Sequence, residues 1–158
     1  MIIDSSAIIA VINGEPEAVS FSNAIAAAVC RISAVNYVEA AIVADNRGES
    51  IRNAFDTLIS EMGLFIEPVT PSQARIARRA YQTYGKGNHS KAKLNMGDCF
   101  AYALAKDLDQ PLLFKGVWCI CWGAVTVGDL SSVQQCHLSE EVVVGAAEHE
   151  PFQEFDLA

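Results

Sequence analysis

Short apolar runs alternate along the chain with longer segments in which apolar residues recur every three or four positions. The short runs predict strands, and the longer, amphipathic segments predict helices. We place the strands near residues 1–4, 30–33, 64–67 and 112–115. Because strands that alternate with helices form a parallel sheet covered on both faces, we expect residues 1–116 to fold as a three-layer α/β/α sandwich with a parallel sheet.

Residues that favour the ends of helices divide the amphipathic segments. Ser33 is a favoured residue before a helix, and Pro71 suits a first turn. Asn13-Gly14 is a favoured stop. We therefore expect six helices, over residues 7–12, 15–29, 34–46, 51–62, 71–84 and 95–108.

The chain of 158 residues is long enough for one domain with a substantial core, and 51% of its residues are hydrophobic. No basic segment followed by an apolar stretch marks a secretory signal at its start. The apolar run over residues 117–127 is too short to span a bilayer, which takes about 20 residues. The five cysteines form no CxxC pair and are interpreted as reduced thiols. These features predict a cytoplasmic protein without a membrane partner.

Charge is distributed unevenly along the chain. Residues 1–116 contain all eleven Lys and Arg residues and twelve acidic residues, a net charge of −1, whereas residues 117–158 contain seven acidic residues and no Lys or Arg, a net charge of −7. Such a break typically marks a change of role or origin. We therefore predict one domain over residues 1–116 and a divergent acidic C-terminal segment, residues 117–158, that packs partly on it.

Three carboxylates stand where chemistry is expected. Asp4 ends the first strand, Glu39 lies early in the helix after the second strand, and Asp98 opens the helix over residues 95–108. Sites in open parallel sheets form at the carboxyl ends of strands, and carboxylates that converge there suit Mg²⁺ or Mn²⁺. Taken singly, Asp4 and Asp98 are equally typical of helix starts, and Glu39 of an exposed helical acid.

Four segments resemble the motifs of PIN-domain proteins. They are Met-Ile-Ile-Asp4-Ser-Ser6, Ile32-Ser33-Ala-Val-Asn36-Tyr-Val-Glu39, Lys93-Leu-Asn95-Met-Gly-Asp98 and Gln110-Pro-Leu-Leu-Phe114-Lys-Gly116. Their spacing is most similar to that of the VapC-type toxins of bacterial toxin–antitoxin pairs, over about residues 1–116. The resemblance implies a PIN-like α/β/α fold, RNA cleavage with Mg²⁺ or Mn²⁺, a small antitoxin protein as partner, and a homodimer.

The resemblance also implies roles for single residues. Asp4 and Asp98 would bind the metal directly, and Glu39 would bind it through water or help to activate the attacking water. Ser6 would support the site by hydrogen bonding. Asn36 would contact the metal-binding residues rather than the metal itself. These five residues form the predicted site.

The resemblance stops after Gly116. The family continues there with one or two acids and later a Thr-Asp segment, whereas this chain has Val117-Trp118, so the fourth acid is missing. A reading-frame change near codon 117 and an alternative C-terminal extension are both compatible with this break, and we favour the first. In a further interpretation, Val125 to Asp129 stands in for the lost strand end, with Asp129 as the fourth acid.

Basic residues flank the loop before Asp98, and Arg78, Arg79, Lys91 and Lys93 are candidates for contact with RNA. A solvated helix face explains the same residues. Tyr81 and Tyr84 could stack on bases, but we favour their interpretation as packing residues. By resemblance, a set of apolar residues near the N-terminus would form the dimer face and an antitoxin groove: Ile8, Ile9, Val11, Ile12, Phe21 and Ile25.

Three functions are compatible with these observations. The first is an active ribonuclease toxin, weakened by loss of the fourth acid. The second is a catalytically impaired PIN-fold protein that acts through antitoxin binding or self-association. The third is a phosphoryl-transfer hydrolase of the haloacid-dehalogenase kind, which needs an Asp two residues after Asp4, where this chain has Ser6. The third function is therefore the one that the sequence supports least.

Overall fold

Five short parallel strands form the central sheet of the structure, a computed structural model that describes residues 1–87, 92–116 and 124–126. The strands lie in the order β3-β2-β1-β4-β5. Their bounds are Ile2–Ile3 (β1), Arg31–Ser33 (β2), Phe65–Glu67 (β3), Leu112–Phe114 (β4) and Ala124–Thr126 (β5). The order of the strands reverses beside β1, which is where parallel sheets of this kind form their sites.

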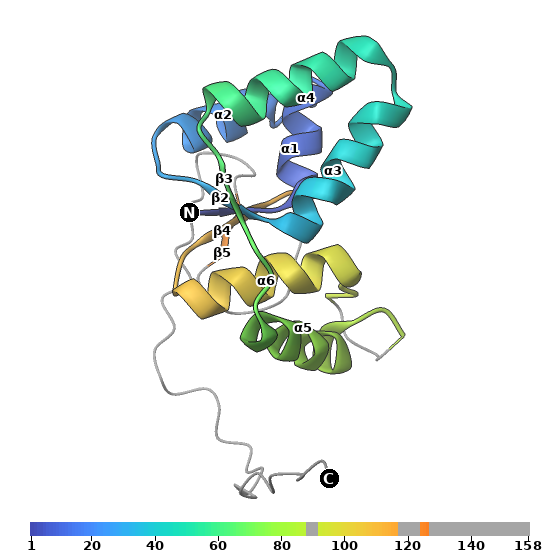
Figure 1. The fold of residues 1–158 in the computed structure, drawn as a ribbon, viewed down its shortest axis with the longest axis vertical. Helices are drawn as coiled ribbons and strands as arrows, with labels where there is room; N and C mark the ends of the chain where they lie inside the picture. Colours follow the sequence, from blue (N-terminus) through green and yellow to red (C-terminus); the bar gives the residue numbers. More distant parts are fainter. Residues whose placement is uncertain (88–91, 117–123, 127–158) are drawn as a thin grey trace, which may run out of the picture.

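Helices cover both faces of the sheet and complete three layers (Figure 1). The helices α1 to α4 lie on one face, and α6 lies on the other, with α5 packed on the outer side of α6. The bounds of the helices are Ser5–Ile12 (α1), Ala18–Ala26 (α2), Ala34–Asn46 (α3), Glu49–Glu61 (α4), Pro71–Tyr84 (α5) and Met96–Leu108 (α6). The predicted α/β/α sandwich with a parallel sheet is confirmed.

Successive strand residues point to opposite faces and so belong to two different cores. Ile3 and Leu113 pack with α1 to α4, in a cluster that includes Phe55. Ile2 and Leu112, their neighbours in the chain, pack against α6. All five side chains are buried, and each contributes about 1.5–3 kcal/mol relative to an exposed position. The strands are therefore fixed in register from both sides.

The structure differs from the prediction at α2. This helix begins at Ala18 rather than near residue 15, and Glu17 at its N-cap position makes no capping hydrogen bond with its side chain. The carboxylates of Glu15 and Glu17 instead face Lys115, which lies about a hundred positions further along the chain. These two acidic residues therefore belong to a tertiary contact rather than to the first turn of the helix.

The apolar residues assigned to a partner surface are largely core residues. Ile8, Phe21 and Ile25 are buried in the cluster under α1 to α4, so these three side chains are not available for the predicted dimer face or antitoxin groove. The exposed large apolar side chains include Val38 and Ile42 on α3. None of the helices in the described part of the chain has the length and apolar character needed to cross a bilayer.

Candidate active site

Asp4 lies at the carboxyl end of β1, buried beneath the start of α1. It is the N-cap residue of α1, and its Oδ2 accepts hydrogen bonds from the Ser6 backbone N–H at 2.9 Å and from Ser6 Oγ at 2.5 Å. Only 1% of Asp4 is exposed. The helix-capping role and the predicted site role thus occur in the same carboxylate, because a strand end and a helix start meet at this residue.

Asn36, in the first turn of α3, holds the other oxygen of Asp4. Its Nδ2 donates to Asp4 Oδ1 at 3.0 Å and to the Gly97 carbonyl at 3.1 Å. Asn36 is fully buried, and its Oδ1 has no hydrogen-bond partner among the described residues. The amide therefore ties β1 to the start of α6 and leaves one buried acceptor at the site.

Glu39 follows one turn later on α3 and lies against α6. Ser5 Oγ donates to Glu39 Oε2 at 2.7 Å. The same oxygen lies so close to Gly97 that a Cβ there would be 2.1 Å from it. Glycine at residue 97 is therefore what allows the Glu39 carboxylate to reach the site.

Asp98 enters the site from the first turn of α6. Its Oδ2 accepts a hydrogen bond from the Asn95 backbone N–H at 2.6 Å, while Asn95 Oδ1 accepts one from the Asp98 N–H at 2.9 Å. This reciprocal pair is a capping box. The helix start thus fixes the carboxylate, and one Asp98 oxygen stays outside this capping pair.

Burial and neighbouring charges alter the protonation of two of the carboxylates, Asp4 and Asp98. Burial raises the pKa of Asp4 to about 6, the charges of Asp98 and Glu39 add to the rise, and the hydrogen bonds from Ser6 oppose it. Burial also raises the pKa of Asp98, and Glu39 adds to that rise, while the Asn95 hydrogen bond and the charge of Lys86 oppose it. Asp4, Glu39 and Asp98 therefore share one electrostatic site.

The donor set suits a hydrated divalent ion better than a closed cage. Among the described residues, no group of three His, Cys, Asp or Glu side chains is arranged to hold a metal ion. Mg²⁺ keeps several of its waters and takes only one or two protein carboxylates. Asp4 and Asp98 offer such a pair, their mutual repulsion is relieved by a cation, and the free Asn36 Oδ1 can accept from a bound water.

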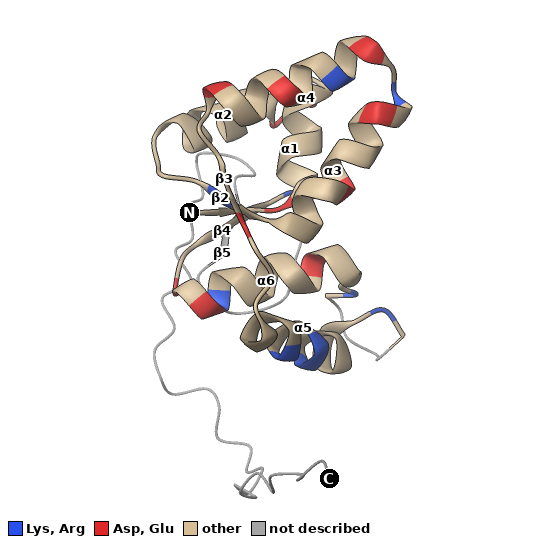
Figure 2. Cartoon of the chain, viewed as in Figure 1, with Lys and Arg blue, Asp and Glu red and all other residues tan. Residues whose placement is uncertain are grey.

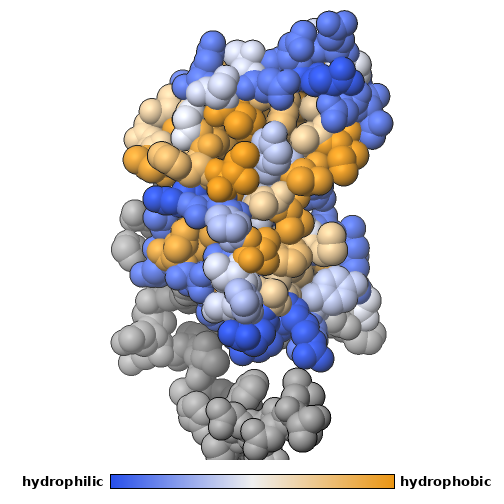
Figure 3. All heavy atoms as spheres, in the orientation of Figure 1, coloured by the Kyte–Doolittle hydropathy of each residue, from blue (hydrophilic) through white to orange (hydrophobic). Residues whose placement is uncertain are grey.

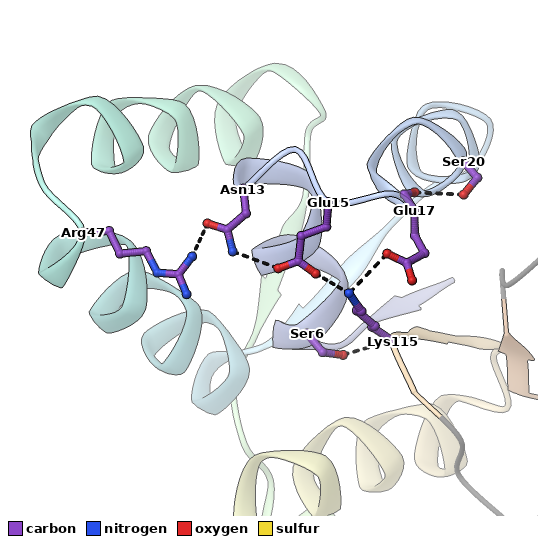
Figure 4. Close-up of polar contacts among 7 residues, drawn as sticks. All are labelled: Ser6, Asn13, Glu15, Glu17, Ser20, Arg47 and Lys115. Atoms are coloured by element: carbon purple, nitrogen blue, oxygen red, sulfur yellow. Dashed lines mark hydrogen bonds and ion pairs between the residues drawn. The ribbon is translucent and has the colours of Figure 1, made fainter.

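A polar network behind Asp4 reaches the end of β4. The Lys115 backbone N–H donates to Ser6 Oγ at 2.9 Å. The Lys115 ammonium lies between the carboxylates of Glu15 and Glu17 in the turn between α1 and α2 (Figure 4). Lys115 thus joins the first and fourth strands' ends through Ser6, which in turn donates to Asp4.

The structure brings together all five residues of the predicted site: Asp4, Ser6, Asn36, Glu39 and Asp98. Sequence reasoning missed Ser5, Gly97 and Lys115 as supporting residues. A glycine in the first turn of a helix weakens the helix and so indicates a close contact, which was the available signal for Gly97.

The remaining candidates are spread over the molecule. Arg78 and Arg79 are exposed on α5, and Lys93 is exposed before α6. Lys91 and Asp129 lie outside the described residues. The strand that we proposed before Asp129 is present in part, since β5 pairs with β4.

An open hollow of about 650 Å³ adjoins the acidic site between α3 and α6. Glu39 and Gly97 form one wall, and Val38, Ile42 and Met96 form an apolar wall. These three side chains are more than half exposed. Apolar residues gather over the middle of this face, where α3 approaches α6, and hydrophilic residues cover its two ends (Figure 3).

Comparison with known proteins gives consistent matches. The PIN domain family matches residues 1–116. Ribonuclease VapC28 of Mycobacterium tuberculosis is 49% identical over 118 residues, which cover 73% of this chain and 89% of the relative. Ribonuclease VapC30 of the same organism is 45% identical over an equal length and with the same coverage.

One solved structure agrees in fold. The crystal structure of the M. tuberculosis toxin VapC20, which cleaves the sarcin–ricin loop, superposes with a TM-score of 0.56 at 15% identity. The superposition covers 70% of this chain and 85% of that one.

Proposed function

The chain belongs to the PIN-domain family and, within it, to the VapC ribonucleases, and on this premise we propose that it is an endoribonuclease that depends on Mg²⁺ or Mn²⁺. The observation that carries the proposal is the convergence of Asp4, Glu39 and Asp98 at the strand ends, where the charges of Asp98 and Glu39 add to the raised pKa of the buried Asp4. Relatives at 41–49% identity are named ribonucleases, which supports RNA as the substrate.

The residues of the site have different roles: metal binding, proton transfer and orientation of the metal ligands. Asp4 and Asp98 would hold the divalent ion, which would stabilise charge on the phosphate and lower the pKa of a coordinated water. Glu39, held by Ser5, accepts a proton from the attacking water or orients it. Ser6 and Asn36 each donate a hydrogen bond to one oxygen of Asp4 and so fix the orientation of its carboxylate.

We propose that this activity is weaker than the family resemblance implies. The family match ends at Gly116, and the next residues are Val117 and Trp118 where the family has an acid. Fewer carboxylates lower the affinity for a divalent ion. The seven acids over residues 117–158 also repel RNA if they approach the site.

The alternative is a PIN-fold protein that binds partners without efficient catalysis. The exposed apolar wall of Val38, Ile42 and Met96 supports it, since such a wall suits a protein partner. In either case we propose that the chain is the toxin component of a toxin–antitoxin pair, that it binds a small antitoxin, and that it forms a homodimer. Sedimentation of the chain alone and with its antitoxin tests the two assemblies.

A fluorescent RNA cleavage assay with Mg²⁺ or Mn²⁺ separates the two functions. We expect slow cleavage by the chain, none by the Asp4→Asn variant, and faster cleavage by a chain that ends after residue 126 and carries Val117→Asp and Trp118→Asp. Equal rates for the last variant and the parent at saturating Mg²⁺ would show that the fourth acid is dispensable. Absence of cleavage by every chain, with antitoxin binding retained, would support the alternative.

The origin of the C-terminal segment has its own test. We propose that a reading-frame change near codon 117 produced residues 117–158. The other frames of the gene beyond that codon should then encode the acidic motif, Asp-Phe followed by Thr-Asp. If no frame encodes it, the segment is an alternative extension instead.

A further inference from the structure

A second hollow, of about 420 Å³, opens along the seam between α5 and α6, and we call it the α5–α6 cavity. Its volume lies within the range of about 300–1,000 Å³ that is usual for small-ligand sites. One face of each helix forms its walls, with residues that recur every three or four positions: Ala74, Ala77, Arg78 and Tyr81 from α5, and Met96 and Phe100 from α6. The two alanines leave the space that larger side chains would fill.

The α5–α6 cavity is adjacent to the acidic site. Met96 belongs both to this cavity and to the hollow that Glu39 and Gly97 line. Asp98 lies in the same first turn of α6. An RNA strand bound in the hollow beside Glu39 can therefore continue past Met96 into the α5–α6 cavity.

The two sides of Met96 differ in charge. From residue 68 to residue 97 the chain has six Lys and Arg residues and no Asp or Glu. Three of the six are arginines on α5, and they form the basic patch on this helix in Figure 2. The helix α3, on the other side of Met96, carries two acids and no Lys or Arg. A polyanion is therefore attracted to the α5 side and repelled from the α3 side.

The walls of the cavity suit a flat heteroaromatic ring. Tyr81 is 44% exposed and Met96 66% exposed, so both present apolar surface at the mouth. Unpaired bases stack on aromatic rings and on Arg guanidinium planes, and Arg78 and Tyr81 lie one turn apart on the same face of α5. The alternative occupant, an apolar protein segment, would offer no negative charge or π surface to the Arg78 guanidinium at the wall of the cavity.

We propose that the α5–α6 cavity binds an unpaired base of the RNA substrate, adjacent to the nucleotide whose phosphate lies at the acidic site. This inference rests on the proposed function and adds to it a requirement for single-stranded RNA at that position. Arg78 and Tyr81 hold the base, whereas Arg79, which does not line the cavity, contributes charge alone.

Binding without cleavage tests the proposal. A labelled short single-stranded RNA, and a set of copies that each lack one base, are titrated against the full chain in EDTA. For the parent chain, one position should lose about tenfold in affinity when its base is removed, which is the usual size of one stacked base. Arg78→Gln and Tyr81→Leu should weaken binding of the intact RNA and abolish the effect of removing that base. Tyr81→Phe keeps the ring and should behave as the parent.

Arg79→Gln is the matched control, since it removes the same charge from the same helix. It should weaken every RNA of the set by the same factor. Equal behaviour of Arg78→Gln and Arg79→Gln, or a parent chain for which no single base matters, would overturn the proposal while leaving the ribonuclease function intact. A Tyr81→Leu chain that sediments as a smaller species than the parent would assign the cavity to a second copy and also overturn it. A parent chain that neither binds nor cleaves any RNA would overturn the proposed function as well.

Discussion

The Glu39 carboxylate occupies the space that a side chain at Gly97 would need. A Cβ on Gly97 would lie 2.1 Å from Glu39 Oε2 and 2.8 Å from the carboxyl carbon, distances that no packed structure tolerates. The obstacle is the end of a flexible side chain, so the protein can yield by moving Glu39. Stability and chemistry should therefore respond differently to substitution at this position.

We expect Gly97→Ala to fold normally and to lose activity. Alanine favours a helix over glycine by up to about 1 kcal/mol, which offsets the loss of the Ser5–Glu39 hydrogen bond at about 1 kcal/mol. Displacement of Glu39 by about 1 Å should cost about 100-fold in cleavage rate. Thermal melts and RNA cleavage measure the two effects. Ser5→Ala is the milder comparison, because it removes the hydrogen bond to Glu39 but introduces no atom that displaces the Glu39 carboxylate. Full activity of Gly97→Ala would show that the position of Glu39 is unimportant.

Metal-free stability should depend on the protonation of Asp4. Its folded pKa is raised to about 6, above the unfolded value, so the folded state binds the proton more tightly and stability falls as pH rises between the two values. A rise of about two pKa units corresponds to about 2–3 kcal/mol. We expect Asp4→Asn to be more stable than the parent near neutral pH and to lose that advantage at about pH 4. Denaturant unfolding in EDTA across this range measures the difference. If the difference in unfolding free energy between the parent and Asp4→Asn did not change with pH, the titration of Asp4 would not be its cause.

Added Mn²⁺ should stabilise the parent chain but not the Asp98→Asn variant. A ligand that binds only the folded state adds about 2.7 kcal/mol at a hundred times its Kd. Asparagine still accepts the capping hydrogen bond from the Asn95 N–H, so the variant should fold. Asp56→Asn, on the exposed face of α4, removes the same charge away from the site and serves as control. An equal Mn²⁺ shift in the Asp98→Asn melts would mean that Asp98 is not a ligand.

Ser6→Ala should shift metal binding to higher pH. The Ser6 hydroxyl lowers the pKa of Asp4 by donating to Oδ2 at 2.5 Å. Without it the pKa rises further, and Asp4 ionises, and so binds metal, only at higher pH. Calorimetric Mn²⁺ titrations at several pH values measure the shift. Ser20→Ala removes a hydroxyl that donates to the Glu17 carbonyl instead (Figure 4) and should leave the profile in place. An unchanged profile for Ser6→Ala would remove Ser6 from the site.

The sequence allowed the layers and the acidic residues to be predicted because both are encoded locally. A strand that ends at Asp4 and a capping pattern at Asn95-Met-Gly-Asp98 can be recognised within a few residues. The contacts that fix the carboxylates are not local. Ser5 reaches Glu39 across 34 positions, and Lys115 reaches Ser6 across 109. Such contacts depend on strand order, which periodicity does not encode.

The same limit explains the error at the N-terminal helices. The apolar residues of α1 and α2 exceed what one helix face needs, and we assigned the surplus to a partner surface. In the fold, α1 is surrounded by α2, α3 and α4, so Ile8 and Phe21 are buried by neighbours within the chain. The exposed large apolar side chains include Val19 on α2, Val38 and Ile42 on α3, and Met96 at the start of α6.

The pairing of β5 with β4 covers the edge of the sheet independently of the fourth acid. An uncovered β4 would expose the unpaired N–H and C=O groups of Leu112, Leu113 and Phe114, an apolar edge that invites strand addition from other chains and aggregation. Ala124–Thr126 occupies that edge in register, although it belongs to the segment beyond the family match. On the proposed loss of the fourth acid, such a gene would still encode a sheet whose β4 edge is covered, and it could persist after selection for its chemistry had relaxed.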